Sequence, residues 1–342
     1  MRDVADAAGV AVSTVSRALA NPGRVSDATL KQIADAARRL GYTPNAAARS
    51  LRSGKTNVIL IVLPGRLTYG ASQVIPHALA GIDAELSQHG YHILIANLDR
   101  LAKTDRHIVD LASGGAVDGV IILSSSVPRV GKRSVLNGGL PVVALFQDLS
   151  AEGVPSVLTN ERAMMRQLTS DLIAQRHRAF YYVCGPAGSY HERQRMGGIH
   201  EALEACGLAP GSLRHSAGQI AYQRGFEIGA DAARDFLALP DRPTAVMCCS
   251  DDAALAFIRV LIDAGVTIPD EVSVTGFDGA AIGTIFSPSL STIEQPAIRM
   301  GAQAASLLLA RLNNAVVPAV TVLDSTFIPR ASTAPFPKGP PT

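Results

Sequence analysis

The chain has 342 residues, 47% of them hydrophobic, which is enough to bury the cores of two or three domains. Its formal net charge of +2 is unevenly placed: residues 1–56 hold nine Lys and Arg against four Asp and Glu, and the remainder holds 22 against 25. No stretch has the pattern of a signal peptide or the ~18 apolar residues of a membrane span, so we expect a cytoplasmic, nucleoid-associated protein without membrane contact. A basic head on a mildly acidic body is typical of a DNA-binding module joined to a sensor.

Residues 2–20 predict a helix-turn-helix. Gly9 permits the tight left-handed turn between two short helices, and apolar residues recur at helical spacing on both sides of it. Many small amphipathic helix pairs share this pattern, so it leaves a purely structural role open. The residues expected in the shared apolar core are Val4, Ala7, Ala8, Val15, Ala18 and Leu19.

The opposite face of the second helix suits DNA. Arg17 can donate two N–H groups to a guanine, and Val12 can contact a thymine methyl group. Thr14, Ser16 and Asn21 are better placed for phosphates, which fix register without reading sequence. The candidate DNA contacts are Val12, Ser13, Thr14, Ser16, Arg17, Asn21, Arg24, Asn45 and Leu51.

A third helix and a hinge follow. Ser26 is a good N-cap, Gly41 ends the helix, and Leu30, Ile33, Ala34, Ala37 and Leu40 form its predicted apolar stripe. Residues 45–53 predict a short alanine-rich helix with almost nothing of its own to bury, which should stay frayed until another surface holds it. Leu51 is either a linker leucine that docks on its own domain or a wedge between base steps in the minor groove.

The runs DVADAAGVAVSTVSRAL and RVSDATLKQIADAARRLGYTPNAAARSLRSGKT, with PTAVMCCSDDAALAFIRVLIDAGVTIPDEVSVTGFD and SPSLSTIEQP later, resemble the lactose-repressor/galactose-repressor family of bacterial transcription regulators. The resemblance covers residues 2–332. It implies a homodimer on a pseudo-palindromic operator, with paired hinge helices in the minor groove and Leu51 as the wedge. It also implies a small-molecule effector that changes operator affinity, and a few residues ahead of Met1 that cap the first helix.

After Thr56 short apolar runs alternate with amphipathic segments, the pattern of an α/β protein. We expect two lobes of doubly wound parallel sheets, a periplasmic-binding-protein-like core behind the N-terminal helix-turn-helix head. Helices are expected near residues 74–89, 103–115 and 130–138. The predicted boundaries are 1–43 for the head, 44–56 for the hinge helix, 57–148 plus 279–313 for lobe 1, 149–278 plus 314–330 for lobe 2, and 331–342 for a disordered tail.

Ligands of such sheets bind outside the carboxyl ends of the strands, here between the lobes. Asp278 follows the strand VSVTGF, and Arg195 begins the helix after FYYVCGP. By resemblance, these two are the effector-contacting aspartate and arginine. A guanidinium and a carboxylate facing one cleft suit the hydroxyls of a sugar or the edge of a base. The alternative for Arg195 is an ion pair with Asp278 or Asp251.

Three further positions refine the expected effector. Ser250 stands where many relatives place an asparagine, and Ile220 stands where some place an aromatic side chain that stacks on the ligand. Tyr69, after the first strand, could supply an aromatic instead. Without a stacking platform at position 220, a sugar or other polyol is favoured over a flat purine.

Enzyme motifs are missing from the sequence. The GKT at residues 54–56 has Arg49 where a phosphate loop needs glycine, HERQR ends in Arg195 where a zinc-protease motif needs histidine, and there is no G-x-S-x-G turn. The cysteines lack disulfide or zinc spacing, so we expect all four reduced, with no metal and no cofactor. A ligand-responsive repressor is the main hypothesis. The rivals are a periplasmic-type sugar-binding protein, which would need a secretory signal, and an enzyme on the same scaffold.

Overall fold

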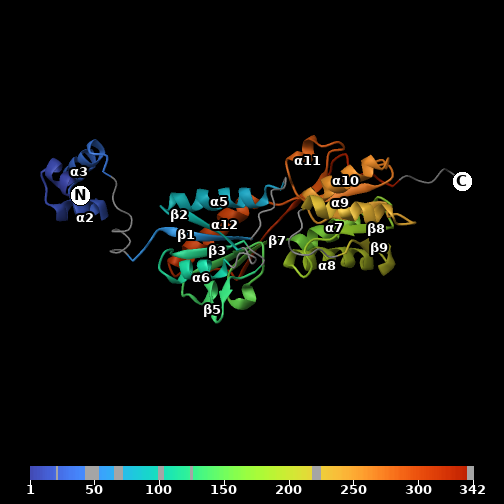
Figure 1. Ribbon diagram of the computed structural model, residues 1–342, viewed down its shortest axis with the longest axis horizontal. Coiled ribbons are helices and arrows are strands. Elements are labelled where there is room, and N and C mark those ends of the chain that lie inside the picture. Colours follow the sequence, from blue (N-terminus) through green and yellow to red (C-terminus); the bar gives the residue numbers. More distant parts are fainter. Residues whose placement is uncertain are drawn as a thin grey trace.

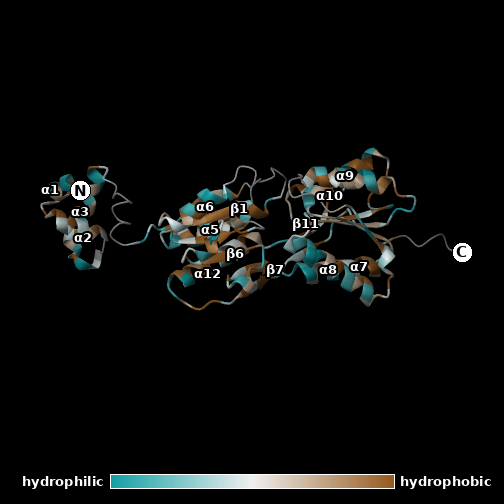
Figure 2. Ribbon diagram, turned by 60° about the horizontal axis from the view of Figure 1, so that its bottom comes forward, coloured by the Kyte–Doolittle hydropathy of each residue, from teal (hydrophilic) through white to brown (hydrophobic). Residues whose placement is uncertain are grey.

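A computed structural model describes residues 1–20, 22–42, 54–64, 72–98, 104–123, 126–217 and 225–336. A small helical head is followed by two α/β lobes placed end to end (Figure 1). In both lobes the strands are mostly hydrophobic, and the covering helices carry many hydrophilic residues (Figure 2).

The head contains α1 (Arg2–Ala8), α2 (Val12–Ala20), a 3₁₀ turn (Pro22–Arg24) and α3 (Asp27–Arg39). Two sequence predictions are confirmed at its turns. Gly9 adopts the left-handed conformation with φ of 64°, and the Ser26 side chain accepts a hydrogen bond from the backbone N–H of Thr29.

The predicted apolar faces of the head are partly wrong. Ala7 and Ala34 are exposed, whereas Ala5 and Ala36 are buried in their place. In α1 the buried face centres between Val4, Ala5 and Ala8, which turns Ala7 to solvent. Leu40 is 49% exposed because it lies past the end of α3. The buried apolar residues of the head are Val4, Ala5, Val15, Ala18, Ile33 and Ala36.

Lobe 1 is built on a parallel sheet in the order β13-β7-β6-β3-β1-β2. One face packs under α5 (Val74–Gln88) and α12 (Ala297–Leu312), and the other faces α6 (Asp105–Ser113). The strands are β1 (Val58–Pro64), β2 (His92–Leu98), β3 (Gly119–Ile122), β6 (Val142–Leu145), β7 (Ser156–Thr159) and β13 (Val320–Leu323).

Lobe 2 has a sheet in the order β14-β12-β11-β10-β8-β9, parallel except for β14. The strands are β8 (Phe180–Val183), β9 (Leu213–His215), β10 (Ala245–Cys248), β11 (Ser273–Asp278), β12 (Ser291–Glu294) and β14 (Thr326–Ile328). The helices pack in pairs, α7 (Glu161–Ala174) with α8 (Tyr190–Ala205) and α9 (Gly225–Leu237) with α10 (Asp251–Asp263), while the short α11 (Ile282–Ile285) follows β11.

The predicted lobe boundaries, 57–148 plus 279–313 and 149–278 plus 314–330, are wrong in detail. The strand at 156–159 joins the first sheet and the strand at 291–294 joins the second, so the chain crosses between the lobes at about residues 160, 295 and 324–325. The stretch 320–328 contributes one strand to each sheet. The order of apolar runs shows where strands are, but the sheet of each strand depends on its hydrogen-bonded neighbour.

Two crossings are joined by hydrogen bonds. The Asn160 Nδ2 donates to Asp324 Oδ1 over 2.9 Å, and the Ser325 N–H donates to Asn160 Oδ1, also over 2.9 Å. The first and third crossings therefore form one polar junction.

Two other expectations are corrected. Residues 130–138 are not a helix: β4 (Arg129–Val130) and β5 (Arg133–Ser134) form a hairpin, followed by a 3₁₀ turn (Val135–Asn137). The tail is ordered through residue 336, with residues 337–342 outside the described part. Ser332 is fully buried and donates to the Val274 carbonyl over 2.6 Å, a side-chain bond that proline-rich composition does not reveal.

All four cysteines are free thiols: Cys206 is exposed, and Cys184, Cys248 and Cys249 are buried. Within the described ranges, no helix combines the length and the apolar character needed to cross a bilayer.

The α5–α12 contact depends on two glycines. A Cβ at Gly81 would overlap the Ile298 carbonyl oxygen, and one at Gly301 would overlap the Ala78 carbonyl oxygen. The two helix backbones therefore approach more closely than any side chain would allow.

We expect Gly81→Ala to lower the free energy of unfolding of the protein by about 1–3 kcal/mol, because neither backbone can give way without moving a helix. Gly211→Ala is the matched control, since a Cβ there meets nothing within 4 Å. Urea unfolding would measure both, and equal stability of the two variants would contradict the close-packing role.

Candidate functional site

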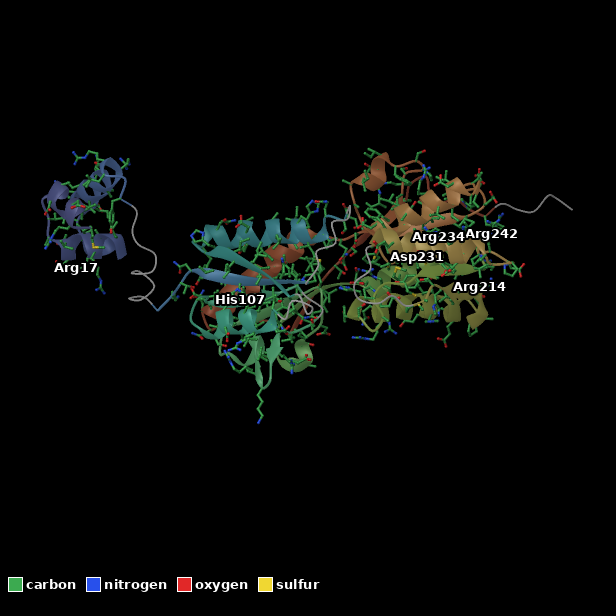
Figure 3. All side chains as sticks on the ribbon, in the orientation of Figure 1. Arg17, His107, Arg214, Asp231, Arg234 and Arg242 are labelled. Carbon is green, nitrogen blue, oxygen red and sulfur yellow. The ribbon has the colours of Figure 1, made fainter. Side chains whose placement is uncertain are left out.

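The helix-turn-helix presents a polar face on α2. Val12, Ser13 and Arg17 are exposed, and Thr14 and Ser16 are half-buried. Arg17 lies on the outer side of α2 (Figure 3). Arg24 is exposed in the turn after α2, while Asn21, Asn45 and Leu51 lie outside the described residues.

The second candidate site lies at the carboxyl ends of the lobe 2 strands, where Asp278 ends β11. Its φ of 121° is rare for a residue with a side chain, and Gly279 follows at φ 80°. A Cβ at Gly279 would come within 2.7–3.0 Å of Glu294. Such backbone strain persists where the surroundings hold it, and it often marks a functional position.

The Asp278 carboxylate has partners from outside lobe 2. Its Oδ1 accepts a hydrogen bond from Gln295 Nε2 over 2.9 Å, and the Ser72 side chain also bonds the carboxylate. Gln295 lies on the second crossing, and Ser72 precedes α5 of lobe 1. Burial raises the pKa of Asp278 to about 6, although Arg195 and these two hydrogen bonds oppose the rise.

Arg195 lies close to Asp278, as the sequence predicted, but its ion pair is with a different acid. Its Nε donates to Glu161 Oε2 over 2.7 Å, and its Nη1 donates to the Cys249 carbonyl. The Phe277 ring covers one face of the guanidinium, with 3.7 Å from Cζ to the ring centroid. Arg195 is 7% exposed. Burial opposes its charge, but Glu161 raises the pKa of Arg195 above its ordinary value.

Glu161 was not among the predicted site residues. It is the first residue of α7 and directly follows the first crossing, so a carboxylate just after a strand end was the available signal. It is 2% exposed and also accepts a hydrogen bond from His191 Nδ1 over 2.6 Å. Burial would raise the pKa of Glu161, but Arg195 and His191 lower it to about 2.

Ser250 and Asp251 mainly support the site. Ser250 caps α10 by accepting the Ala253 N–H over 3.2 Å. Asp251 is fully buried and accepts bonds from the Thr292 hydroxyl over 2.6 Å and from the Ala280 N–H over 2.5 Å. Burial and the charge of Asp278 raise the pKa of Asp251 to about 7. Asp251 thus fixes the turn that follows Asp278, and the alternative ion pair of Arg195 with Asp251 does not form.

Two buried oxygens beside Asp278 and Arg195 lack a hydrogen-bond partner among the described residues: Gln295 Oε1, on the side chain that bonds Asp278, and Glu192 Oε1, on the same helix as Arg195. The other buried side-chain atoms without a partner there are Gln147 Nε2, Gln175 Oε1 and Ser325 Oγ. Buried polar atoms are nearly always bonded to protein or water, so unpaired ones are expected where a polar ligand binds. Gln295 Oε1 and Glu192 Oε1 are both acceptors, which suits a ligand rich in donors. Ile220 and Tyr69, the other predicted effector contacts, lie outside the described residues.

The described residues contain no group of three or more His, Cys, Asp or Glu arranged to hold a metal ion. Fold and site together define a two-lobed ligand-binding core joined to a helix-turn-helix head. Residues 1–45 match the model of bacterial regulatory proteins of the lacI family, and residues 169–333 match a periplasmic binding protein-like domain. The chain belongs to the lacI family of bacterial transcription regulators, which are DNA-binding proteins and not enzymes.

Similar proteins span the whole chain. The HTH-type transcriptional repressor CytR of Escherichia coli K12 is 30% identical over 339 residues, covering 98% of this chain and 97% of that protein. The structure of the transcriptional regulator CelR–cellobiose complex is 27% identical with a TM-score of 0.70, covering 97% and 98%. The lac repressor dimer bound to operator and the anti-inducer ONPF has a TM-score of 0.81 at 22% identity, covering 97% and 98%, and shows the shared fold.

We expect the stability of Asp278→Asn relative to the parent to rise as the pH rises. The folded parent binds the Asp278 proton more tightly than the unfolded chain, so its stabilising contribution is full below pH ~4 and is lost as the pH rises through about 6. Between pH ~5 and ~8 the difference should change by roughly 1–2 kcal/mol.

Urea unfolding of both proteins across this range measures the effect. The buried His177, whose pKa is lowered by burial, contributes a trend that is common to both and cancels in the difference. Asp251 does not cancel: Asp278→Asn removes the charge that raises its pKa, and this change adds to the difference in the same direction. Asp263→Asn, at a surface carboxylate paired with Arg259, is the control. A pH-independent difference would show that Asp278 is not held as described.

Proposed function

We propose that the protein is a repressor that binds a pseudo-palindromic operator as a homodimer and responds to a carbohydrate effector held between the lobes. The observation that carries this proposal is the position of Asp278, which bonds Gln295 on a crossing and Ser72 of lobe 1. A ligand that takes over this carboxylate exchanges those contacts for its own and so changes the balance between lobe arrangements. Because operator DNA lies in the cytoplasm, the proposed function is a cytoplasmic one.

Several features support the DNA-binding half of the proposal. Arg17, Val12 and Ser13 are exposed on α2, the second helix of a helix-turn-helix, which enters the major groove. Thr14, Ser16, Asn21, Arg24 and Asn45 are proposed to contact the DNA backbone, and Leu51 to act as the minor-groove wedge.

Exposed apolar side chains support the homodimer. β2 is an edge strand of its sheet and exposes Leu94 and Ile95, while α11 exposes Ile282 and Ile285, the last by 79%. Strand edges and apolar patches of this kind are normally covered. α5, beside β2, and α11 lie along the same upper side of the two lobes (Figure 1), where a second copy would cover both.

The effector half of the proposal assigns five residues to the effector site: Arg195, Asp278, Ser250, Ile220 and Tyr69. The carboxylate of Asp278 and the unpaired oxygens of Gln295 and Glu192 accept hydrogen bonds, which matches the hydroxyl groups of a sugar. A structural neighbour was solved as a cellobiose complex, which agrees with this class.

Arg17→Ala should reduce the preference for operator over random DNA by about 1–3 kcal/mol, since base contacts specify and phosphate contacts only position. Arg24→Ala should weaken binding to all sequences alike. Titration of labelled operator and random duplexes at one salt concentration measures both. A uniform loss on Arg17→Ala would reassign Arg17 to the backbone.

Asp278→Ala should abolish the effector response and leave a folded, operator-binding dimer. A thermal-shift screen with monosaccharides, disaccharides, sugar acids, polyols and purines identifies ligands, because a ligand at 100 times its Kd adds ~2.7 kcal/mol of stability. Each hit is then tested for release of labelled operator by the parent, by Asp278→Ala and by the surface control Asp263→Ala. A hit that acts equally on all three would place the effector site elsewhere.

A further inference from the structure

Arg195 is engaged inside lobe 2 before any ligand is present. Its charge is matched by Glu161 at 2.7 Å, its Nη1 is held by the Cys249 carbonyl, and the Phe277 ring covers one face of the guanidinium. The pair is buried, so water screens it little. To bind an anion, Arg195 would have to share a charge that Glu161 already neutralises.

Besides His191, which also contacts Glu161, the described charged groups around Arg195 are mostly acidic. Asp278 and Glu192 are close enough to Cys249, whose carbonyl holds Arg195, to raise the pKa of its thiol. Asp278 in turn is close enough to Asp251 to raise the pKa of that carboxyl. The two unpaired buried polar atoms beside Asp278 and Arg195, Gln295 Oε1 and Glu192 Oε1, are acceptors. In the described part of the chain, these groups attract hydrogen-bond donors and repel a carboxylate or phosphate.

We propose that Glu161 sets the charge class of the effector: by holding Arg195 in an internal ion pair, it makes the site select an uncharged sugar or polyol and reject sugar acids and sugar phosphates. This inference rests on the proposed function, because it concerns the same site. Glu161 then acts as a specificity residue through Arg195, and it excludes sugar acids and sugar phosphates as effectors.

The chain offers a matched control pair on α7 and α8. Glu201 binds Arg162 at 2.6 Å, with side chains 41% and 52% exposed. Glu201→Gln therefore releases an arginine at the surface of the same two helices, whereas Glu161→Gln releases one in the buried site. Only the second should create a selective anion site.

The experiment compares the full-length parent with Glu161→Gln, Glu201→Gln and the double variant Glu161→Gln/Arg195→Gln. Each is titrated in thermal-shift assays with inorganic phosphate and with gluconate, against sodium chloride at equal ionic strength. We expect several degrees of extra stabilisation of Glu161→Gln by phosphate or gluconate, because the anion replaces the missing carboxylate. The parent, Glu201→Gln and the double variant should respond as they do to chloride.

A folded Glu161→Gln that responds to these anions as the parent does would overturn the proposal. If Glu161→Gln does not fold, the parent decides the question through its response to neutral and anionic sugars: stabilisation by a neutral sugar and not by the anions supports the proposal. In the parent, glucose and galactose are compared with gluconate, galacturonate and glucose 6-phosphate. Stabilisation by an acid or a phosphate that Arg195→Gln abolishes would also overturn the proposal.

Failure of this inference and failure of the proposed function can be told apart. The anion response of Glu161→Gln is measured without DNA and without knowing the effector. Operator binding and its release by a ligand are measured separately on the parent. A parent that ignores operator would refute the proposed function even if the anion response appears, and an operator-binding parent released by a sugar acid would refute only the charge-class inference.

Discussion

The three crossings between the lobes are the constraint on which the rest of the core depends. The first and third are joined through Asn160, whose amide bonds both Asp324 and Ser325. The second carries Gln295, which bonds the last residue of β11. Three of the site residues are tied to a crossing: Glu161 follows the first, Gln295 lies on the second, and Asp278 bonds Gln295. A relative movement of the lobes would therefore act directly on the proposed effector-binding groups.

Three carboxylates near this junction show how the environment separates the pKa values of groups with the same chemistry. Glu161 contacts two basic side chains, and its pKa falls to about 2 despite burial. Asp278 and Asp251 lie near each other with mainly neutral donors as partners, and their pKa values rise to about 6 and about 7. The Glu161 carboxyl is therefore ionised throughout the physiological pH range. The pKa values of Asp278 and Asp251 lie near physiological pH. A ligand that donates hydrogen bonds to Asp278 therefore favours its ionised form.

Much of this could be predicted from the sequence, for identifiable reasons. The turn at Gly9, the cap at Ser26 and the alternation of apolar runs with helices are local signals, and they gave the head and the α/β class of the core. The proximity of Arg195 and Asp278 followed from the strand ends and the family resemblance. The sheet to which residues 156–159 and 291–294 belong depends on pairing between distant segments, which apolar runs do not encode. The partner of Arg195 was missed for the same reason, since Glu161 lies 34 residues away on another helix.

A single carboxylate, that of Asp118, holds the first residues of the core in place. Asp118, just before β3, accepts hydrogen bonds from the Thr56 N–H and hydroxyl at 2.8 and 2.9 Å through one oxygen and from the Asn57 N–H at 2.8 Å through the other. These bonds fix the first residues of the core to the middle of the lobe 1 sheet. Residues 56 and 57 would therefore move together with lobe 1 if that lobe rotated. Ser72 of the same lobe bonds Asp278 of lobe 2. A rotation of lobe 1 that broke this bond would therefore also move residue 56, with no contiguous relay of side chains between the two.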